Sequence, residues 1–164
     1  MPPLGASMPD GSAVGEIEEA ELISALQTGD VVSGVTDGTG RVVQATLLRD
    51  CLRQTQTHSS PGGLRLDSVM VAGCLDLTGL TVPFPLWFRA CRFDAAPVLE
   101  GSQLFALAIV NSPQLPGLLA NGLHVQRDLD LSGSHIAGAH WTSVSTSKPA
   151  AVWLCEAEIG GRLL

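Results

Sequence analysis

An apolar residue recurs every 11 positions over the last two-thirds of the chain, and this spacing limits the possible folds more than any other feature. Leu64, Leu75 and Leu86 are 11 residues apart, and Leu118 and Leu129 repeat the step. The same series also contains Val98, Leu107, Val152 and Leu163. Three companion series of apolar residues run beside it: Leu66, Leu77, Phe88, Ile109, Ala120, Leu131 and Leu154; Val69, Leu80, Cys91 and Leu123; and Val71, Val82, Phe93, Val125, Ile136 and Ile159. The repeating unit is an apolar-x-apolar pair, with alternating steps of 5 and 6 between pairs.

An apolar-x-apolar pair places two side chains on one face of a short strand. Two such units make a coil of about 22 residues, and successive coils stack at the ~4.8 Å spacing of paired strands. The pattern predicts a mostly β chain, a right-handed parallel β-helix (solenoid) over 62–164 that is truncated at its C-terminal end. The competing prediction is a parallel α/β protein, but no stretch after Gly63 shows a helical stripe of apolar residues.

The region before Gly63 predicts a small helical cap over 16–61. Residues 1–15 are rich in Pro, Gly and Ser, as in a disordered tail. Apolar residues from Ile17 to Leu26 fall on one helix face, and Gly29 stands where such a helix would end. Residues 36–40 predict a hairpin turn between two short strands, and a second amphipathic helix is expected over 42–53.

Charge and cysteine usage exclude several classes of protein. The net charge is −7, and residues 1–30 contribute −6 of it, so the rest of the chain is nearly balanced. Without a basic patch we expect no direct binding of nucleic acid. No apolar run approaches the ~20 residues that span a bilayer, and no signal peptide is visible, so a soluble, cytoplasmic protein is expected. Cys51, Cys74, Cys91 and Cys155 stand singly, which argues against a zinc site and for free thiols.

Three segments share a motif, namely 64–71, 73–82 and 127–136, and 156–163 looks like a fourth copy. This motif resembles the pentapeptide-repeat superfamily, and in particular a β-helical group found in actinobacterial proteins, often labelled oxidoreductase. The resemblance covers about the last two-thirds of the chain and departs from the strict five-residue step. It implies a parallel β-helix, and it suggests gyrase protection by DNA mimicry as one function.

The repeat is interrupted at 137–151. From Leu129 to Val152 is 23 residues, so this half-coil is expected to be one residue longer than the others. His140 and Trp141 lie within the interruption, with His135 before it and Trp153 after it. A break in a repeat often carries a binding surface, so these four residues form a candidate ligand or partner site. In the alternative interpretation Trp141 fills the gap and the histidines are merely exposed.

No known catalytic or metal-binding motif is present. Asp37-Gly-Thr-Gly40 is interpreted as a turn, and Asp76 and Asp130, each between two inward leucines, are expected to point outward. We therefore predict no catalytic residue, metal site or cofactor. The leading hypothesis is a non-catalytic scaffold or protein-binding module that binds a protein partner or self-associates through its open C-terminal coil. Two alternatives stay open: the gyrase-protecting DNA mimic, and an enzyme with a site near residues 135–153.

Overall fold

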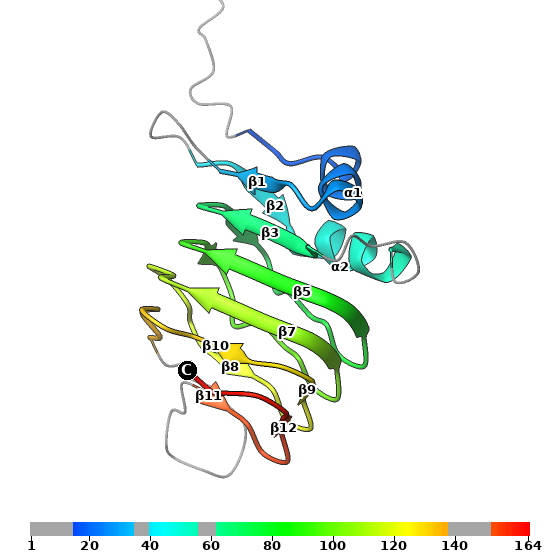
Figure 1. Cartoon of the computed structure of the whole chain (residues 1–164). Coiled ribbons are helices and arrows are strands. Elements are labelled where there is room, and N and C mark those ends of the chain that lie inside the picture. Colours follow the sequence, from blue (N-terminus) through cyan, green and yellow to red (C-terminus); the bar gives the residue numbers. More distant parts are fainter. Residues whose placement is uncertain (1–14, 35–39, 56–61, 138–151) are drawn as a thin grey trace, which may run out of the picture.

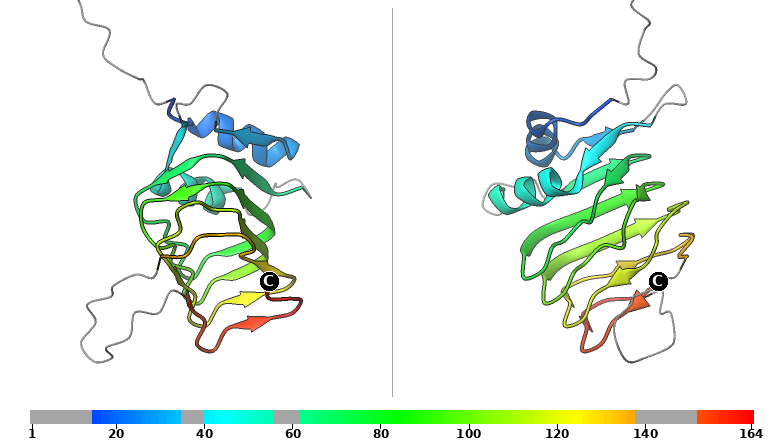
Figure 2. Two further views of the ribbon diagram at one scale, coloured as in Figure 1. Left: turned by 90° about the vertical axis from the view of Figure 1, so that its left-hand side faces the viewer. Right: turned by 180° about the vertical axis from the view of Figure 1, so that it is seen from behind.

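The computed structural model describes residues 15–34, 40–55, 62–137 and 152–164. Two ten-residue helices, α1 (Glu19–Thr28) and α2 (Ala45–Gln54), lie at one end of a stack of parallel strands (Figure 1). Successive passes of the chain lie one above another in the direction away from the helices, as the two further views also show (Figure 2). The described C-terminal strands therefore lie at the end opposite α1 and α2.

The strands form three parallel sheets. The largest contains β1 (Val31–Ser33), β3 (Leu64–Asp67), β5 (Thr81–Arg89), β7 (Gln103–Val110), β9 (His124–Val125) and β12 (Glu158–Ile159), with β10 (Leu129–Asp130) also paired to β7. The second contains β2 (Val42–Gln44), β4 (Met70–Ala72) and β6 (Arg92–Phe93). The third pairs β8 (Leu118–Leu119) with β11 (Val152–Trp153).

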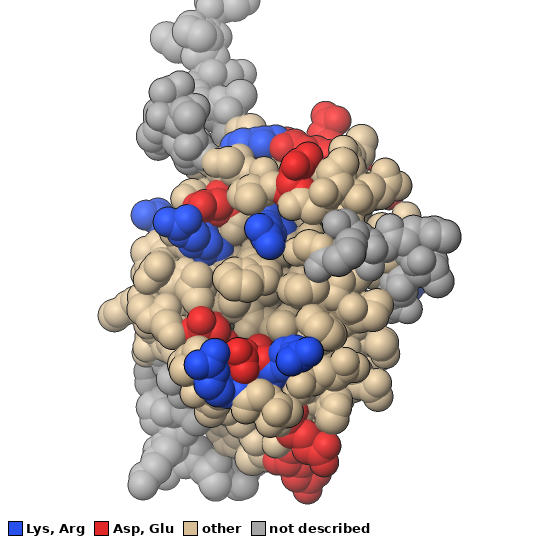
Figure 3. All heavy atoms as spheres, viewed as in Figure 1, with Lys and Arg blue, Asp and Glu red and all other residues tan. Residues whose placement is uncertain are grey.

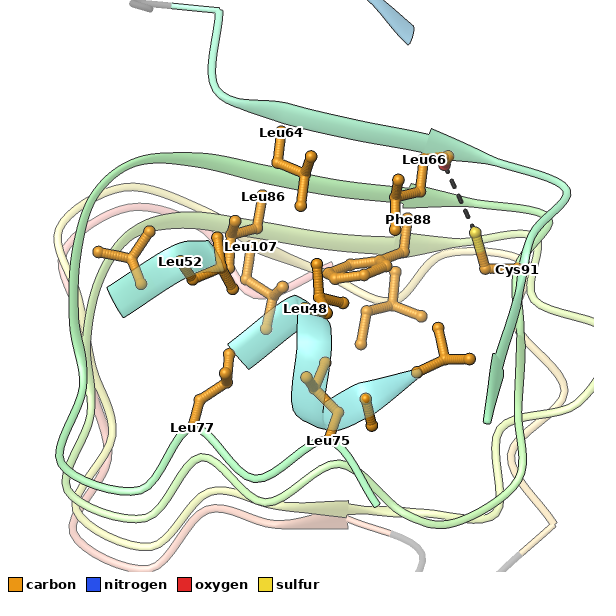
Figure 4. Packing of buried hydrophobic residues seen from close by; sticks show 14 of the residues in the cluster. Leu48, Leu52, Leu64, Leu66, Leu75, Leu77, Leu86, Phe88, Cys91 and Leu107 are labelled. Carbon is orange, nitrogen blue, oxygen red and sulfur yellow. Dashed lines mark hydrogen bonds between the residues drawn. The ribbon is translucent and has the colours of Figure 1, made fainter. Parts of the chain in front are cut away.

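The predicted stacking of apolar columns is confirmed. Leu64 pairs with Leu86, and Leu86 pairs with Leu107. All three side chains are buried, and they point into the interior that α2 also fills (Figure 4). The neighbouring column behaves in the same way, with Leu66 beside Phe88. In-register stacking gives each layer a dry contact with the next, which is the source of its stability.

The predicted fold class is nevertheless wrong. The chain is a mixed α/β fold with parallel sheets, and not the mostly β, right-handed parallel β-helix expected from the repeat. Both helices contribute to the core, because Leu22, Leu26, Leu48 and Leu52 are fully buried in the same cluster as the strand residues. The interval between paired residues also varies, being 34 between β1 and β3, 28 between β2 and β4 and 22 between β3 and β5. The spacing of apolar residues predicts which side chains face inward, but it does not predict the length or the structure of the segments that connect two paired strands.

Two local predictions near the N-terminus have different outcomes. The expected hairpin is wrong, because β1 and β2 lie in different sheets and each pairs in parallel with a later strand. The helix end at Gly29 is confirmed: this residue adopts φ 77°, and its N–H donates to the Ala25 carbonyl at 2.7 Å. Glycine is favoured there because it adopts the left-handed conformation without steric cost.

The C-terminal register differs from the expected one. Val152 pairs with Leu118 and Ile159 pairs with Val125, both 34 residues apart, whereas Leu104 and Val125 are only 21 apart. The interruption before Val152 is therefore much longer than the single extra residue expected. The error came from matching Val152 to Leu129, since both positions are apolar and the sequence offers no way to choose between them.

A smaller register error affects Val98. Its bridge partner is Asp76, so the buried residue of this layer is Leu99 and Val98 is only partly buried. The expected outward direction of Asp76 is consistent with this pairing, because its carboxylate accepts a hydrogen bond from the exposed backbone N–H of Thr78. A one-residue shift exchanges the faces of a strand, so an apolar residue at either position satisfies a count of spacings.

Two buried serines at the corners between strands have hydrogen-bond partners. Ser112 Oγ donates to the Cys91 carbonyl at 2.6 Å, and Ser102 Oγ donates to the Leu99 carbonyl at 2.7 Å. Between α1 and the chain entering β2, Arg41 Nη1 donates to Glu21 Oε1 at 2.7 Å. This hydrogen bond is the main reason that the pKa of Glu21 is lowered. The two serine hydrogen bonds stabilise the irregular connections, since an unpaired buried hydroxyl group is costly.

Among the described residues, no helix is long and apolar enough to cross a membrane.

The four cysteines are free, as predicted, and they fall into two classes. Cys51 and Cys91 are buried, and desolvation raises the pKa of Cys51 to about 11 and that of Cys91 to about 12. Cys74 and Cys155 are exposed. Because the reagent must reach the sulfur and the thiolate is the reactive form, we expect Cys155 to react fastest with a thiol reagent and the buried pair slowest. Cys74 should react at an intermediate rate, because it is exposed but desolvation raises its pKa as well. Mass spectrometry of the native chain after a timed alkylation would measure this, and equal labelling of all four thiols would contradict the burial.

Candidate protein-binding surface

One row of outward-pointing side chains runs down the large sheet. Side chains alternate between the two faces of a strand, so residues between inward-facing leucines point out. The pairing registers align Val31, Arg65, Trp87, Ala108 and Asp130 across β1, β3, β5, β7 and β10. Leu164 continues this row, because its N–H donates to the Leu129 carbonyl and its own carbonyl accepts from the Leu131 N–H, one residue either side of Asp130.

Large apolar side chains are exposed along this row. Trp87 is 46% exposed, Val31 is 53% exposed and Leu164 is 50% exposed. In the described part of the chain only one other large apolar residue is classed as exposed, namely Leu163, which neighbours Leu164. Single exposed apolar residues are ordinary, but a row of them on one face marks an interaction surface.

Two hollows lie on either side of Trp87, each with a volume of about 260 Å³. One lies toward β1 and is lined by Val31, Arg65, Leu66, Asp67, Trp87 and Arg89. The other lies toward β10 and is lined by Trp87, Ala106, Leu107, Ala108, Arg127, Asp128, Asp130, Arg162 and Leu164. The second is deepened by the two small alanines, so Trp87 is a ridge beside a depression. We call the surface formed by these two sets of residues the Trp87 face.

Charged groups border the Trp87 face at both ends, with an apolar zone between them (Figure 3). Near β3 and β5, Arg89 Nη1 lies 3.7 Å from Asp67 Oδ2, and near β10, Arg162 Nη2 lies 3.4 Å from Asp128 Oδ2. The Arg162 backbone N–H also donates to Asp128 at 2.6 Å, and this bond is the main cause of the lowered pKa of Asp128. The Arg65 guanidinium lies 6.0 Å from the centre of the Trp87 ring. The surface thus combines an aromatic anchor with ion pairs of both signs.

The candidate residues taken from the sequence lie elsewhere. His135 is exposed, and its backbone pairs with Ser112 and Leu115. Trp153 lies on β11 and pairs with Leu119; its Nε1 is buried and has no hydrogen-bond partner among the described residues. His140 and Trp141 lie outside the described residues. The described contacts do not bring His135 and Trp153 together.

Sequence reasoning missed Trp87, although a signal was available. Trp87 stands between the inward residues Leu86 and Phe88, so the repeat itself placed it on the outer face. A tryptophan at an outward position is unusual enough to suggest a binding surface. The hollow beside it had no such signal, because it depends on which residues of β7 lie next to Trp87.

The C-terminal layer is a second incompletely covered surface. Leu163 is 54% exposed, although its partner Leu129 is fully buried. Ile159 is only partly buried, whereas its partner Val125 is fully buried. The last layer therefore exposes Leu163 and Ile159 to solvent at positions that are buried in the layer before it. The outer edges of β11 and β12 also have no strand partner within the described chain.

Comparison of the chain with protein-family models, curated protein sequences and solved structures finds no match. The described residues contain no group of three or more His, Cys, Asp or Glu side chains that could hold a metal ion.

Proposed function

We propose that this chain is a non-catalytic protein-binding module that works through the Trp87 face. The observation that carries the proposal is the exposed Trp87 ring between two hollows of about 260 Å³ each, with one ion pair beside each hollow. Hot spots of protein interfaces have this composition: a central aromatic residue that is desolvated on binding, surrounded by a polar rim that includes arginine.

The charged groups on this face favour recognition over catalysis. Asp67 forms an ion pair with Arg89, and Asp128 forms an ion pair with Arg162 and also accepts a hydrogen bond from the Arg162 backbone N–H. The lowered pKa of Asp128 moves it away from the range useful to a general acid or base near neutral pH. Such groups give orientation and specificity to a partner of complementary charge.

The C-terminal layer is included in the proposal as a second contact surface. Covering Leu163 and the partly buried Ile159 would remove apolar area from water, which stabilises association. The free edges of β11 and β12 could also pair with a strand of another protein. Self-association or partner binding at this end therefore remains part of the proposed function.

We propose that the module acts in the cytoplasm, where its free cysteines would stay reduced. We also propose that it does not bind nucleic acid directly. The relation to pentapeptide-repeat proteins stays a proposal drawn from the sequence motif. DNA mimicry is not carried forward as a second function, because a mimic needs a continuous acidic face. On the Trp87 face Arg65, Arg89, Arg127 and Arg162 lie among the aspartates.

The function can be tested by photo-crosslinking from within the face. A photoreactive benzophenone amino acid replaces Val31, and the full chain is irradiated in the cells that produce it. We expect an adduct with protein that disappears when Trp87→Ala is added, because the tryptophan supplies the desolvated anchor. The same probe at Gln103, exposed and away from the hollows, is the control and should give no such adduct. Equal crosslinking from both positions, or none from Val31, would contradict the proposal.

A further inference from the structure

We propose that the partner of the Trp87 face is a second copy of this chain, bound face to face about a two-fold axis. The axis would run along the strand direction, between the rows of Trp87 and Ala108. This inference rests on the proposed function and adds the identity of the partner. It follows from the order of residues down the outward row.

The outward row is self-complementary when its order is reversed. From the helical end it reads Val31, Arg65, Trp87, Ala108, Asp130 and Leu164. A two-fold axis along the strands reverses the order of rows in the second copy and keeps positions along the strands. The first residue then faces the sixth, the second faces the fifth and the third faces the fourth. Each of these three pairings is favourable.

The central pairing fits by shape. Trp87 is exposed, and Ala106 and Ala108 line the hollow beside it. Reversal places each copy's Trp87 over the other copy's alanines. Filling the hollow removes the exposed indole from water and gives it dispersion contacts, twice per dimer.

The outer pairings fit by charge and polarity. Arg65 of one copy faces Asp130 of the other, so the dimer contains two ion pairs of opposite charge across the interface. Beyond them Val31 faces Leu164, and both side chains are about half exposed in the single chain. In the flanking row that contains Asp67 and Arg89, reversal places Arg89 opposite Val110 and Asp67 opposite Ser132, so no like charges face each other there.

The area indicates a weak, concentration-dependent dimer. β5 and β7 have nine and eight residues, but β1, β3 and β10 have three, four and two. Six rows at ~4.8 Å and a width of about four residues at ~3.3 Å give a face of ~350 Å² per copy. The total of ~700 Å² lies below the usual size of permanent interfaces and in the range of transient ones. Facing sheets of this kind pack ~10 Å apart with their strands nearly aligned, which the proposed axis allows.

The first test is the molar mass of the purified full chain in solution, by light scattering or sedimentation over a range of concentrations. We expect the mass to rise with concentration toward twice the 17.1 kDa of one chain. Trp87→Ala should weaken the dimer at least ~30-fold, the loss typical of a hot-spot residue. Arg92→Ala, exposed on β6 of another sheet, is the matched control and should leave the mass unchanged. A monomer at all concentrations, or a dimer that survives Trp87→Ala, overturns the inference.

A charge exchange gives a second test that does not depend on Trp87. The variants Arg65→Asp and Asp130→Arg should each be monomeric, because each homodimer would contain two like-charge pairs. An equimolar mixture of the two variants should form a heterodimer, since each interface pair then has opposite charges. Circular dichroism confirms that both variants are folded. Failure of the mixture to associate contradicts the proposed axis.

The photo-crosslink from Val31 separates this inference from the proposed function. In the dimer the probe faces Leu164 of the second copy, whereas Val31 and Leu164 of one chain are five rows, or about 24 Å, apart. A peptide joining position 31 to the C-terminal residues, in a species of twice the chain mass, supports the dimer. A Trp87-dependent adduct with a different protein, with the purified chain monomeric, leaves the proposed function standing and overturns this inference.

Discussion

Replacing Phe88 by alanine is expected to lower the free energy of unfolding by about 3–5 kcal/mol. Phe88 is buried between Leu66 and Ile109 in its column, and its ring meets the edge of Phe93 with centroids 5.6 Å apart. The substitution leaves a cavity that the stacked layers cannot close, because each layer is fixed by hydrogen bonds to the next. With a total stability of about 5–15 kcal/mol for a typical domain, this is a severe loss.

The matched control for Phe88→Ala is Trp87→Ala, at the adjacent position of β5. The two side chains point to opposite faces of the same strand, and Trp87 is 46% exposed. We expect the loss at Trp87 to stay below about 1 kcal/mol when unfolding is measured at low protein concentration. Urea denaturation followed by far-UV circular dichroism gives both values. Equal losses at the two positions would mean that the faces of β5 have been assigned wrongly.

Gly63→Ala is expected to destabilise the chain by about 3 kcal/mol through the backbone alone. Gly63 has φ +68°, and a Cβ atom there would lie 2.0 Å from the Pro85 carbonyl oxygen. Both the conformation and the space are therefore unsuited to alanine. The obstacle is backbone of β5, so relief requires a shift of β5 relative to the start of β3.

Gly79→Ala separates the two causes. Gly79 has nearly the same φ, +67°, but a Cβ there would meet nothing within 4 Å. It should cost only ~1–2 kcal/mol, the price of the left-handed conformation for a residue with a side chain. Thermal or urea unfolding of the two variants measures the difference. If Gly79→Ala proved as damaging as Gly63→Ala, close approach of β5 would not be the cause.

The part of the fold that the sequence predicts well is the set of residues that face inward. Leu64, Leu86 and Leu107 lie in one column, where each layer needs an apolar side chain because the position is buried. This requirement applies to each position separately, so it is visible in the sequence. The end of α1 at Gly29 could also be predicted, since the left-handed conformation at a helix end favours glycine at that position.

The fold class and the C-terminal register were beyond the reach of this reasoning. The interval from Leu118 to Val152 depends on a segment without apolar pairs, which periodicity cannot measure. The helices α1 and α2 were expected, but their apolar faces proved to complete the same core as the strands. An amphipathic helix shows which face is buried and does not show what that face packs against.

The candidate site illustrates the same division. The sequence by itself determined that Trp87, Arg65 and Asp130 point away from the core, because strand alternation leaves them no other direction. Only the tertiary structure decided that they lie in one row, with Ala108 between Trp87 and Asp130. That order depends on hydrogen-bonded pairing between distant strands, and pairing is selected by the energy of the whole stack and not by any one segment.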